Sequence, residues 1–234
     1  MSDKSFIYRI ISRDRLFQLF DNGENVLVAP SKWEDPFENF ILRAPIQLNS
    51  GEWGDFSFHD DFYGQCWTLH KSSDAMWRIY SPGKNAVRIR TSIKRLGQGL
   101  SVHHGQWAHM QCYVGRVEYL SESKLRKFSE RVFKGGLSPK ACARSLLVKR
   151  WAFKHEREIR LLYFEKKKEK WANGLYRYRV DPHDLIDQIM IDPRLPVSEA
   201  ETFKDEIRTK TGFKGEIKRS LLYAPPKGFV IRLP

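Results

Sequence analysis

The sequence lacks several features that would assign a protein to a large class. No apolar run approaches the roughly 18 residues that a membrane-spanning helix needs. The stretch Met1–Ile11 does not contain the apolar core of a secretory signal peptide. There is no internal repeat and no low-complexity linker. We therefore expect a cytoplasmic protein that has no membrane partner.

Cysteine is scarce. Cys66, Cys112 and Cys142 lie far apart, and no two of them form a Cys-x-x-Cys pair. This spacing argues against a disulfide framework and against a structural zinc site. Free thiols are typical of a reducing compartment, which agrees with a cytoplasmic location.

Acidic residues are outnumbered by basic ones. The chain has 41 Lys and Arg against 28 Asp and Glu, a formal net charge of +13. A surface with this excess attracts polyanions, so we expect a nucleic acid or a nucleotide ligand. Many proteins are basic only for solubility, and charge alone does not separate the two cases.

The residues that are present predict a folded protein. The 234 residues are 41% hydrophobic and 13% aromatic, which is enough for a sizeable core in a single globular domain over residues 1–234. Predicted strands and helices follow one another without the regular strand–helix–strand alternation of parallel sheets. The pattern predicts an α+β fold with one twisted, mainly antiparallel sheet and flanking helices.

The stretch from Trp151 to Phe164 is the most informative one. Its second half is rich in β-branched and aromatic residues, which predicts a strand. Strand side chains alternate between two faces, so Glu156, Glu158 and Arg160 would point the same way. Two neighbouring carboxylates raise the pKa of at least one of them, unless a cation such as Arg160 lies between them. The alternative is a solvated ladder of ion pairs on an exposed sheet face.

The opposite face of this strand would carry Ile159, Leu161 and Tyr163, which suits packing against a core. Two other segments carry residues that could belong to a functional site. Residues 30–38 form an acidic turn that Pro36 stiffens. Residues 74–80 are predicted to be a helix with Met76, Trp77 and Tyr80 on one side, a pattern that belongs to a core more often than to a site.

Several short motifs resemble a bacterial family known chiefly as a domain of unknown function. They are Tyr8-Arg9 before a leucine-bearing helix, Asp35-Pro-Phe-Glu38, Cys66 in a strand, Ala75-Met-Trp-x-x-Tyr80-Ser81 and His155-Glu-x-Glu-Ile-Arg160. The motifs span most of the chain. The sequence departs from the family pattern at Trp33-Glu34, where the pattern has Phe-Asn. The resemblance implies an association with bacterial stress or phage-defence loci.

A more distant resemblance is to ADP-ribosyltransferases of the arginine, serine, glutamate type. Such enzymes carry an arginine on the first strand, a Ser-Thr-Ser element on a middle strand and Glu-x-Glu on a later strand. Arg9 and Glu156-x-Glu158 occur in that order here, and Thr68 is the nearest match to the middle element. The resemblance implies NAD as the cofactor, nucleic acid or protein as the acceptor, and a toxin-like activity.

The same resemblance implies a role for each residue. Breaking the bond between nicotinamide and ribose generates a cationic sugar, which Glu158 would stabilise. Glu156 would orient or deprotonate the acceptor, and Arg9 would hold the pyrophosphate. Trp77 or Tyr80 would stack on the nicotinamide. The other residues expected around the cofactor are Tyr8, Thr68, Ser81 and Arg160.

Two other functions remain open on the same residues. Asp35 or Glu38, together with Glu156 and Glu158, could bind Mg²⁺ for phosphodiester hydrolysis, with Arg160 near the scissile phosphate. A nuclease would more typically have a lysine in that place.

The third function is a binding module without catalysis. In the predicted strand at residues 175–180, Tyr176 and Tyr178 alternate with Arg177 and Arg179. Exposed tyrosines would stack on single-stranded nucleic acid while the arginines neutralise its phosphates. The same alternation also fits a half-buried strand with a charged outer face.

Overall fold

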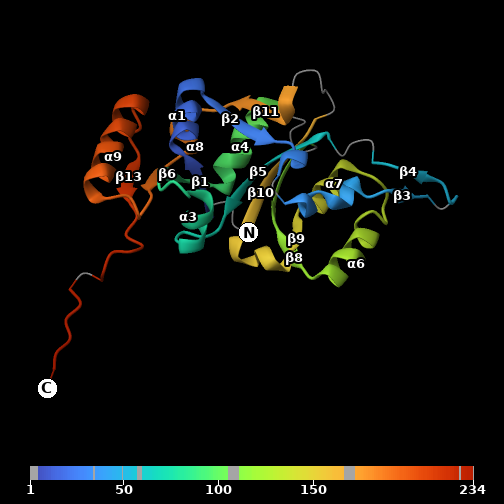
Figure 1. Cartoon of the computed structure of the whole chain (residues 1–234). Coiled ribbons are helices and arrows are strands. Elements are labelled where there is room, and N and C mark those ends of the chain that lie inside the picture. Colours follow the sequence, from blue (N-terminus) through green and yellow to red (C-terminus); the bar gives the residue numbers. More distant parts are fainter. Residues whose placement is uncertain are drawn as a thin grey trace.

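A large sheet forms the centre of the computed structural model, which describes residues 5–33, 35–48, 50–56, 60–104, 111–165, 172–226 and 228–233 (Figure 1). Within these residues the strands of the sheet are β1 (Phe6–Ser12), β2 (Glu24–Val28), β5 (Phe62–Thr68), β6 (Ala86–Ser92), β7 (Cys112–Arg116), β10 (Glu158–Phe164), β11 (Leu175–Arg179), β12 (Gln188–Ile191) and β13 (Glu216–Arg219). Their order is β11-β2-β5-β1-β6-β12-β13, and β10 pairs with β5 and with β7. Within the described part of this sheet, β12 and β13 are the only neighbouring strands that run parallel. The prediction of an α+β fold with a mainly antiparallel sheet is confirmed.

Helices and two small sheets surround the large one. The α-helices are α1 (Arg13–Asn22), α2 (Phe40–Arg43), α3 (Asp74–Tyr80), α4 (Ile93–His104), α6 (Glu122–Val132), α7 (Pro139–Ser145), α8 (Pro182–Leu185) and α9 (Val197–Thr211). The 3-10 helices are η1 (Pro30–Lys32), η2 (Pro36–Glu38), η4 (Trp151–Glu156) and η6 (Ala172–Gly174). The small sheets pair β3 (Ile46–Gln47) with β4 (Trp53–Gly54) and β8 (Glu118–Leu120) with β9 (Val148–Arg150). None of the helices in the described part of the chain combines the length and the hydropathy that a bilayer crossing requires.

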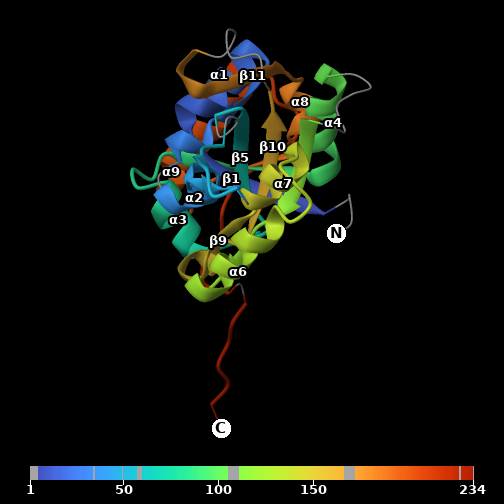
Figure 2. The same ribbon diagram turned by 90° about the vertical axis from the view of Figure 1, so that its right-hand side faces the viewer.

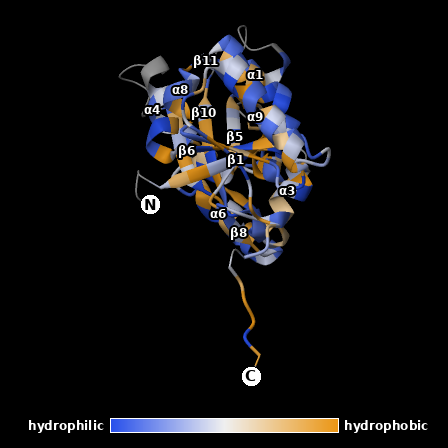
Figure 3. Cartoon of the chain, turned by 90° about the vertical axis from the view of Figure 1, so that its left-hand side faces the viewer, coloured by the Kyte–Doolittle hydropathy of each residue, from blue (hydrophilic) through white to orange (hydrophobic). Residues whose placement is uncertain are grey.

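The main core lies on one face of the large sheet. As predicted, Ile159, Leu161 and Tyr163 of β10 are buried in it. Helices α1, α4, α8 and α9 cover this face with apolar residues such as Leu16 and Phe203. In Figure 3 the hydrophobic colour gathers on the central strands, and much of the outer surface of these helices is hydrophilic. The opposite face of β10 is therefore the one that carries the predicted charged residues.

The tyrosines of β11 belong to the same core. Tyr176 and Tyr178 are each 1% exposed, and Asn25 donates a hydrogen bond to the Tyr178 hydroxyl over 2.7 Å. Arg177 and Arg179 on the alternate positions are exposed. Stacking of nucleic acid on exposed tyrosines of this strand is therefore wrong. The half-buried strand with a charged outer face is confirmed.

The sheet divides beside β5. One edge of β5 pairs with β10 along the whole strand, from Phe62 to Thr68. On its other edge β5 pairs with β1 only at Thr68 and with β2 only at Gly64. Strands β1 and β2 diverge between these two pairings, and we call this gap the fork. Figure 2 shows β5 and β10 near the centre, with α1 and β11 at one end of the molecule and β9 and α6 at the other.

Local sequence places α1 over the fork. The Ser12 side chain accepts a hydrogen bond from the Arg15 backbone N–H over 3.3 Å and so caps the helix. Gly23 ends it with a left-handed φ of 59°, which glycine adopts without steric cost. Buried Leu16 and Leu19 fix the inner face of the helix. The turn after Gly23 then leads directly into β2, the second arm of the fork.

Candidate active site

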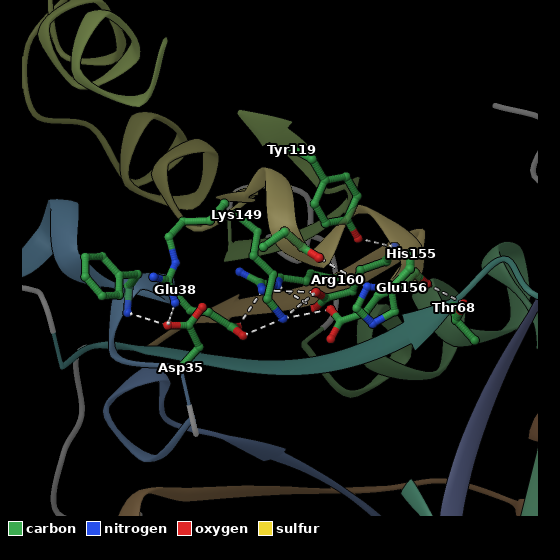
Figure 4. A network of polar contacts seen from close by, with 12 residues as sticks. Asp35, Glu38, Thr68, Tyr119, Lys149, His155, Glu156 and Arg160 are labelled. Carbon is green, nitrogen blue, oxygen red and sulfur yellow. Dashed lines mark hydrogen bonds and ion pairs between the residues drawn. The ribbon is translucent and has the colours of Figure 1, made fainter. Parts of the chain in front are cut away.

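Five charged side chains meet on the face of β10 that is opposite the main core (Figure 4). They are Glu38 from η2, Lys149 from β9, Glu156 from the end of η4, and Glu158 and Arg160 from β10. We call these residues the charge network. None of them is more than 7% exposed. The alternative of a solvated ion-pair ladder on an exposed face is therefore wrong, because these charges are buried.

Lys149 is the centre of the charge network. Its Nζ lies 2.7 Å from Glu156 Oε2, 2.8 Å from Glu38 Oε1 and 3.7 Å from Glu158 Oε2. The sequence analysis missed this residue, because it stands in a basic stretch and nothing local distinguishes it from surface lysines. Only the pairing of β9 with β8 carries it beneath the acidic turn. Lys149 is therefore the cation that lies between the two glutamates of the Glu-x-Glu motif.

Arg160 holds Glu158 with both prongs of its guanidinium. Nε donates to Glu158 Oε1 over 2.7 Å and Nη2 to Glu158 Oε2 over 3.1 Å. The same Nη2 also donates to Glu38 Oε2 over 2.5 Å. Nη1 donates to the Leu146 carbonyl over 2.6 Å, and the guanidinium carbon lies 4.5 Å from the centre of the Trp33 ring. Such two-pronged, charge-assisted bonds fix the orientation of the carboxylate.

The two carboxylates that Arg160 binds have pKa values shifted in opposite directions. Burial acts to raise the pKa of Glu158, but Arg160 and Lys149 together bring it below its ordinary value. Burial raises the pKa of Glu38, and the same two cations offset this only in part. Burial also opposes the charge on Lys149, whereas the three glutamates raise its pKa above the ordinary value. Glu158 is thus kept ionised inside the protein.

Glu156 reaches the network by a turn and not along a strand. The strand begins only at Glu158, since η4 ends at Glu156 and Arg157 between them has a left-handed φ of 44°. The expectation that Glu156 and Glu158 share a strand face is therefore corrected. Thr68 holds the turn in place, because its hydroxyl donates to the Glu156 carbonyl over 2.6 Å. The Leu69 backbone N–H adds a bond of 3.1 Å to the Arg157 carbonyl.

Three of the predicted residues lie side by side across the sheet. Tyr8 of β1 is in register with Thr68 of β5, which is in register with Glu158 of β10. Residues in register on adjacent strands project to the same face. Tyr8 and Thr68 are buried. The structure therefore brings Tyr8, Thr68 and Glu158 together, as the sequence analysis expected of a cofactor site.

Helix α3 divides its three predicted residues between different surroundings. Trp77 is 1% exposed and belongs to the interior, so the structure presents no uncovered face of its ring to a nicotinamide. Ser81 is buried and donates a hydrogen bond of 2.6 Å to the buried Asp192, which anchors the end of the helix. Tyr80 is 45% exposed, and its hydroxyl donates to Glu156 Oε1 over 3.4 Å. Tyr80 is thus the residue that connects the charge network to the surface.

The acidic turn contributes one residue to the charge network. Glu38 enters it, as described above. Asp35 instead accepts hydrogen bonds from the Phe37 backbone N–H over 3.0 Å and from Arg150 over 3.2 Å. These bonds cap η2 and orient Arg150, so Asp35 has a structural role in the turn.

The donor set does not favour Mg²⁺. Glu38, Glu156 and Glu158 do converge, but Lys149 and Arg160 already donate to their oxygens. Cys66 comes close to two of them, since the ligand atoms of Glu38, Cys66 and Glu158 lie within 4.8 Å of one another.

A thiol is also a poor ligand for Mg²⁺, which prefers oxygen. Burial, followed by the charge of Glu158, raises the pKa of Cys66 and keeps the thiol protonated. A metal ion at this position would have to displace a lysine and an arginine from carboxylates that hold them closely. The charge network therefore fits an internal ion-pair cluster better than a metal centre.

Arg9 lies on the other side of the sheet from its neighbour Tyr8. It lines a pocket of about 270 Å³ at the fork. The pocket also receives Arg15 and Gln18 from α1, Asn25 from β2, Gln65 and Trp67 from β5, and Arg177 from β11. Alternation along β1 directs consecutive side chains to opposite faces, so Arg9 does not share the face of Tyr8, Thr68 and Glu158.

No carboxylate among the described residues pairs with the Arg9 guanidinium. Burial lowers the pKa of Arg9, and electrostatic interactions with Cys66 and Tyr80 oppose this effect. Strand register gives the relation between the two parts: Thr68 and Glu158 share the face of Tyr8, whereas Arg9 faces the other way. The Arg9 pocket and the charge network therefore lie on opposite faces of the large sheet.

Apolar and polar side chains both line the pocket, and hydrogen bonds hold part of its polar wall in place. Gln65 Nε2 donates to Asn25 Oδ1 over 2.7 Å, and Trp67 Nε1 donates to Gln65 Oε1 over 2.8 Å. Three arginines line the pocket, whereas its carboxylate, Glu24, lies 3.9 Å from Arg179. The pocket thus has an excess of positive charge, which suits an anionic ligand.

Comparisons with known proteins do not assign the chain to a family. No family model and no curated protein matches it. The chain aligns with Thermus sp. 2.9 DarT in complex with carba-NAD+ at 12% identity, over 94% of this chain and 97% of that chain, with a TM-score of 0.41. It aligns with Thermus sp. 2.9 DarT in complex with ADP-ribosylated ssDNA at 12% identity, over 94% of this chain and 95% of that one, with a TM-score of 0.42. A similarity at this level identifies neither the family nor the activity of the chain.

Proposed function

We propose that the chain binds NAD at the fork and transfers its ADP-ribose part to an acceptor. The observation that carries the proposal is the position of Arg9. It is an arginine without a carboxylate partner among the described residues, in a pocket that two further arginines line. A nucleotide with a diphosphate group would engage this pocket, and its ribose would reach the charge network on the other face of β5 by passing through the fork.

The pocket suits the diphosphate part of the ligand. A guanidinium binds phosphate oxygens in pairs, and a site with few competing carboxylates strengthens that attraction. Arg15 and Arg177 line the same pocket and add to the positive field. A volume of about 270 Å³ is below that of typical whole-ligand pockets, so only part of a dinucleotide would be enclosed. The nicotinamide end would extend past Tyr80 toward the charge network.

The charge network suits the reacting part. In the transfer, the bond between ribose and nicotinamide breaks and its electron pair leaves with nicotinamide. A lone pair of the acceptor forms the new bond to the ribose, and the acceptor proton passes to a carboxylate. Glu158 is kept ionised by Arg160 and would stabilise the cationic sugar by its field. Glu156 contacts the exposed Tyr80, so we assign it the acceptor proton.

Release of nicotinamide from NAD, measured with bulk cellular protein and nucleic acid present as acceptors, tests the proposal. Wild-type protein is expected to release nicotinamide, and Arg9→Gln and Glu158→Gln are expected to lose most of this activity. Glu199→Gln on the exposed surface of α9 serves as the matched control and should retain full activity. Because Glu158 is buried, circular dichroism must first show that its variant is folded. Absence of nicotinamide release from the wild type, or full activity in a folded Arg9→Gln, would contradict the proposal.

An enzyme that consumes NAD and modifies cellular acceptors would also be toxic. Induced expression of the wild type in a bacterial host is therefore expected to slow growth, as a defence system or toxin would. Expression of Glu158→Gln at the same level should not. Equal growth inhibition by the two proteins would show that the toxicity does not come from ADP-ribose transfer and would contradict this expectation.

A further inference from the structure

We infer that a surface formed by η2, η4 and the residues next to them binds single-stranded nucleic acid. This inference deepens the proposed function, on which it rests, because it names the class of acceptor. The surface combines two contacting pairs, Phe37 with Arg150 and Trp151 with Lys154, with the exposed Arg157 that directly follows η4. We call it the aromatic–cation surface. The sequence analysis singled out none of these five residues as a ligand contact.

Two large aromatic rings are exposed on this surface. Trp151 is 57% exposed and Phe37 is 46% exposed. Each ring already carries a cation: Lys154 Nζ lies 4.1 Å from the Trp151 ring centre, and the Arg150 guanidinium carbon lies 4.1 Å from that of Phe37. Alternating rings and cations are the composition that binds unpaired bases and their phosphates.

Lys154 and Arg157 are available for phosphate. Both are exposed, and neither pairs with a carboxylate among the described residues. Arg150 is partly neutralised by Asp35, at 3.2 Å, and this contact fixes the guanidinium over Phe37. The surface therefore combines one oriented arginine with two free cations, a charge pattern complementary to a phosphate backbone.

The backbone of Arg157 adds an independent observation. Its φ of 44° is left-handed, a conformation that an arginine adopts only under constraint. The constraint comes from β5, because the Leu69 N–H and the Thr68 hydroxyl bind the carbonyls of residues 157 and 156. Strain of this kind is concentrated at functional sites. Here it turns the Arg157 side chain outward while Glu156 points inward.

The aromatic–cation surface is continuous with the charge network. Phe153 lies between them, with Lys149 Nζ 4.4 Å and the Arg150 guanidinium carbon 5.4 Å from its ring centre. Phe37 directly precedes Glu38, and η4 runs from Trp151 to Glu156. A strand of nucleic acid on this surface would therefore pass beside Glu156, which we assigned to the acceptor proton.

The rings select single strands over duplexes and over acidic peptides. Bases in a duplex are stacked on each other, so a protein ring reaches them only where they are unpaired. An acidic peptide would use the cations but gain little from the rings. A large contribution of the aromatic rings to the binding affinity therefore indicates single-stranded nucleic acid, whereas binding that depends only on the cations indicates an acidic peptide.

Fluorescence anisotropy with a labelled oligothymidine of about 12 nucleotides, in the absence of NAD, tests the inference. Trp151→Ala is expected to weaken binding by at least about fivefold. Trp53→Ala, which removes a 68% exposed tryptophan from β4, is the matched control and should bind as the wild type does. Lys154→Ala should lower the slope of log affinity against log salt by about 0.7.

Arg157→Gly is a second test variant. It removes a cation and should leave the fold intact, because glycine adopts the left-handed conformation without steric cost. It should weaken oligothymidine binding without loss of thermal stability. The inference is overturned if the wild type does not bind, if Trp151→Ala binds like Trp53→Ala, or if polyglutamate competes as well as the oligonucleotide does. Oligothymidine binding is measured without NAD, and nicotinamide release is measured with a mixture of protein and nucleic-acid acceptors, so a failure of this inference is distinct from a failure of the proposed function.

Discussion

Removal of the ammonium group of Lys149 is the sharpest test of what the charge network does for the fold. Lys149→Met keeps an unbranched side chain of similar length, but it removes the Nζ that lies 4.4 Å from the centre of the Phe153 ring. The change deprives Glu156 and Glu38 of donors at 2.7 and 2.8 Å. Arg160 then remains as the only cation that faces the three carboxylates among the described residues.

The expected loss of stability is large. Removing one partner of a buried ion pair costs about 3–5 kcal/mol, because the remaining charge stays buried without compensation. A typical domain has about 5–15 kcal/mol of unfolding free energy in total. Lys149→Met is therefore expected to retain the fold only marginally. Lys204→Met, which removes a surface lysine paired with Glu201 on α9, should change the free energy by less than about 0.5 kcal/mol.

The loss of unfolding free energy in Lys149→Met should depend on pH, and the pKa shifts of the carboxylates give the direction of that dependence. A carboxyl group whose folded pKa is raised, such as Glu38, contributes stability below its unfolded pKa, and this is lost as pH rises through the folded value. Without Lys149 the pKa of Glu38 rises further. Glu158 behaves in the opposite way, because its lowered pKa contributes stability that is lost as pH falls through the folded value. The deficit of Lys149→Met should therefore be greater at about pH 8 than at about pH 5.

Urea unfolding followed by tryptophan fluorescence measures both effects. The prediction requires a loss of at least about 3 kcal/mol near neutral pH and a smaller loss in acid. A variant within about 1 kcal/mol of the wild type, or a loss independent of pH, would refute the view that Lys149 compensates buried carboxylates.

The same unfolding measurement tests three other substitutions. Arg157→Gly should raise the unfolding free energy by about 0.5–1 kcal/mol, since it relieves a left-handed backbone, and a decrease would disprove strain at that residue. Gly64→Ala should cost about 1–3 kcal/mol, because the added carbon would lie 2.6 Å from a ring carbon of Trp33; a neutral result would mean that the ring can move aside. Ser81→Ala should cost about 1–3 kcal/mol, because the buried Asp192 loses its hydroxyl donor, and unchanged stability would show that the bond is dispensable.

Local alternation in the sequence was sufficient to predict β10 and its two faces. Ile159 and Leu161 enter the core, and Glu158 and Arg160 share the other face, because a strand of seven residues has a strict period of two. The prediction failed at Glu156, one turn earlier. The residue types around Arg157 do not predict its left-handed backbone, because hydrogen bonds from β5 impose that conformation.

The composition of the candidate site depended on contacts between distant segments. Lys149 reaches the glutamates through the parallel pairing of β8 with β9, for which the sequence has no local signal. Arg9 was predicted as a site residue, but the pocket that it lines is formed by residues of α1, β2, β5 and β11 that are distant from it in the sequence. Helical spacing likewise placed Trp77 and Tyr80 on one side of α3, although only packing against neighbouring elements buries one and exposes the other. Residue patterns thus predicted four of the five residues of the charge network, all but Lys149. The contacts among them depend on pairing between distant strands.

Binding of ADP-ribose to the purified protein, measured by isothermal titration calorimetry, tests the central claim most directly. ADP-ribose contains the diphosphate that we assign to the Arg9 pocket, and its binding does not depend on turnover. The account predicts that Arg9→Gln weakens binding by at least about tenfold, since a charge-assisted hydrogen bond contributes about 1.5–3 kcal/mol. Arg131→Gln, an exposed arginine at the end of α6, should leave the affinity unchanged. Equal affinity of Arg9→Gln and the wild type, or no binding by either, would contradict it.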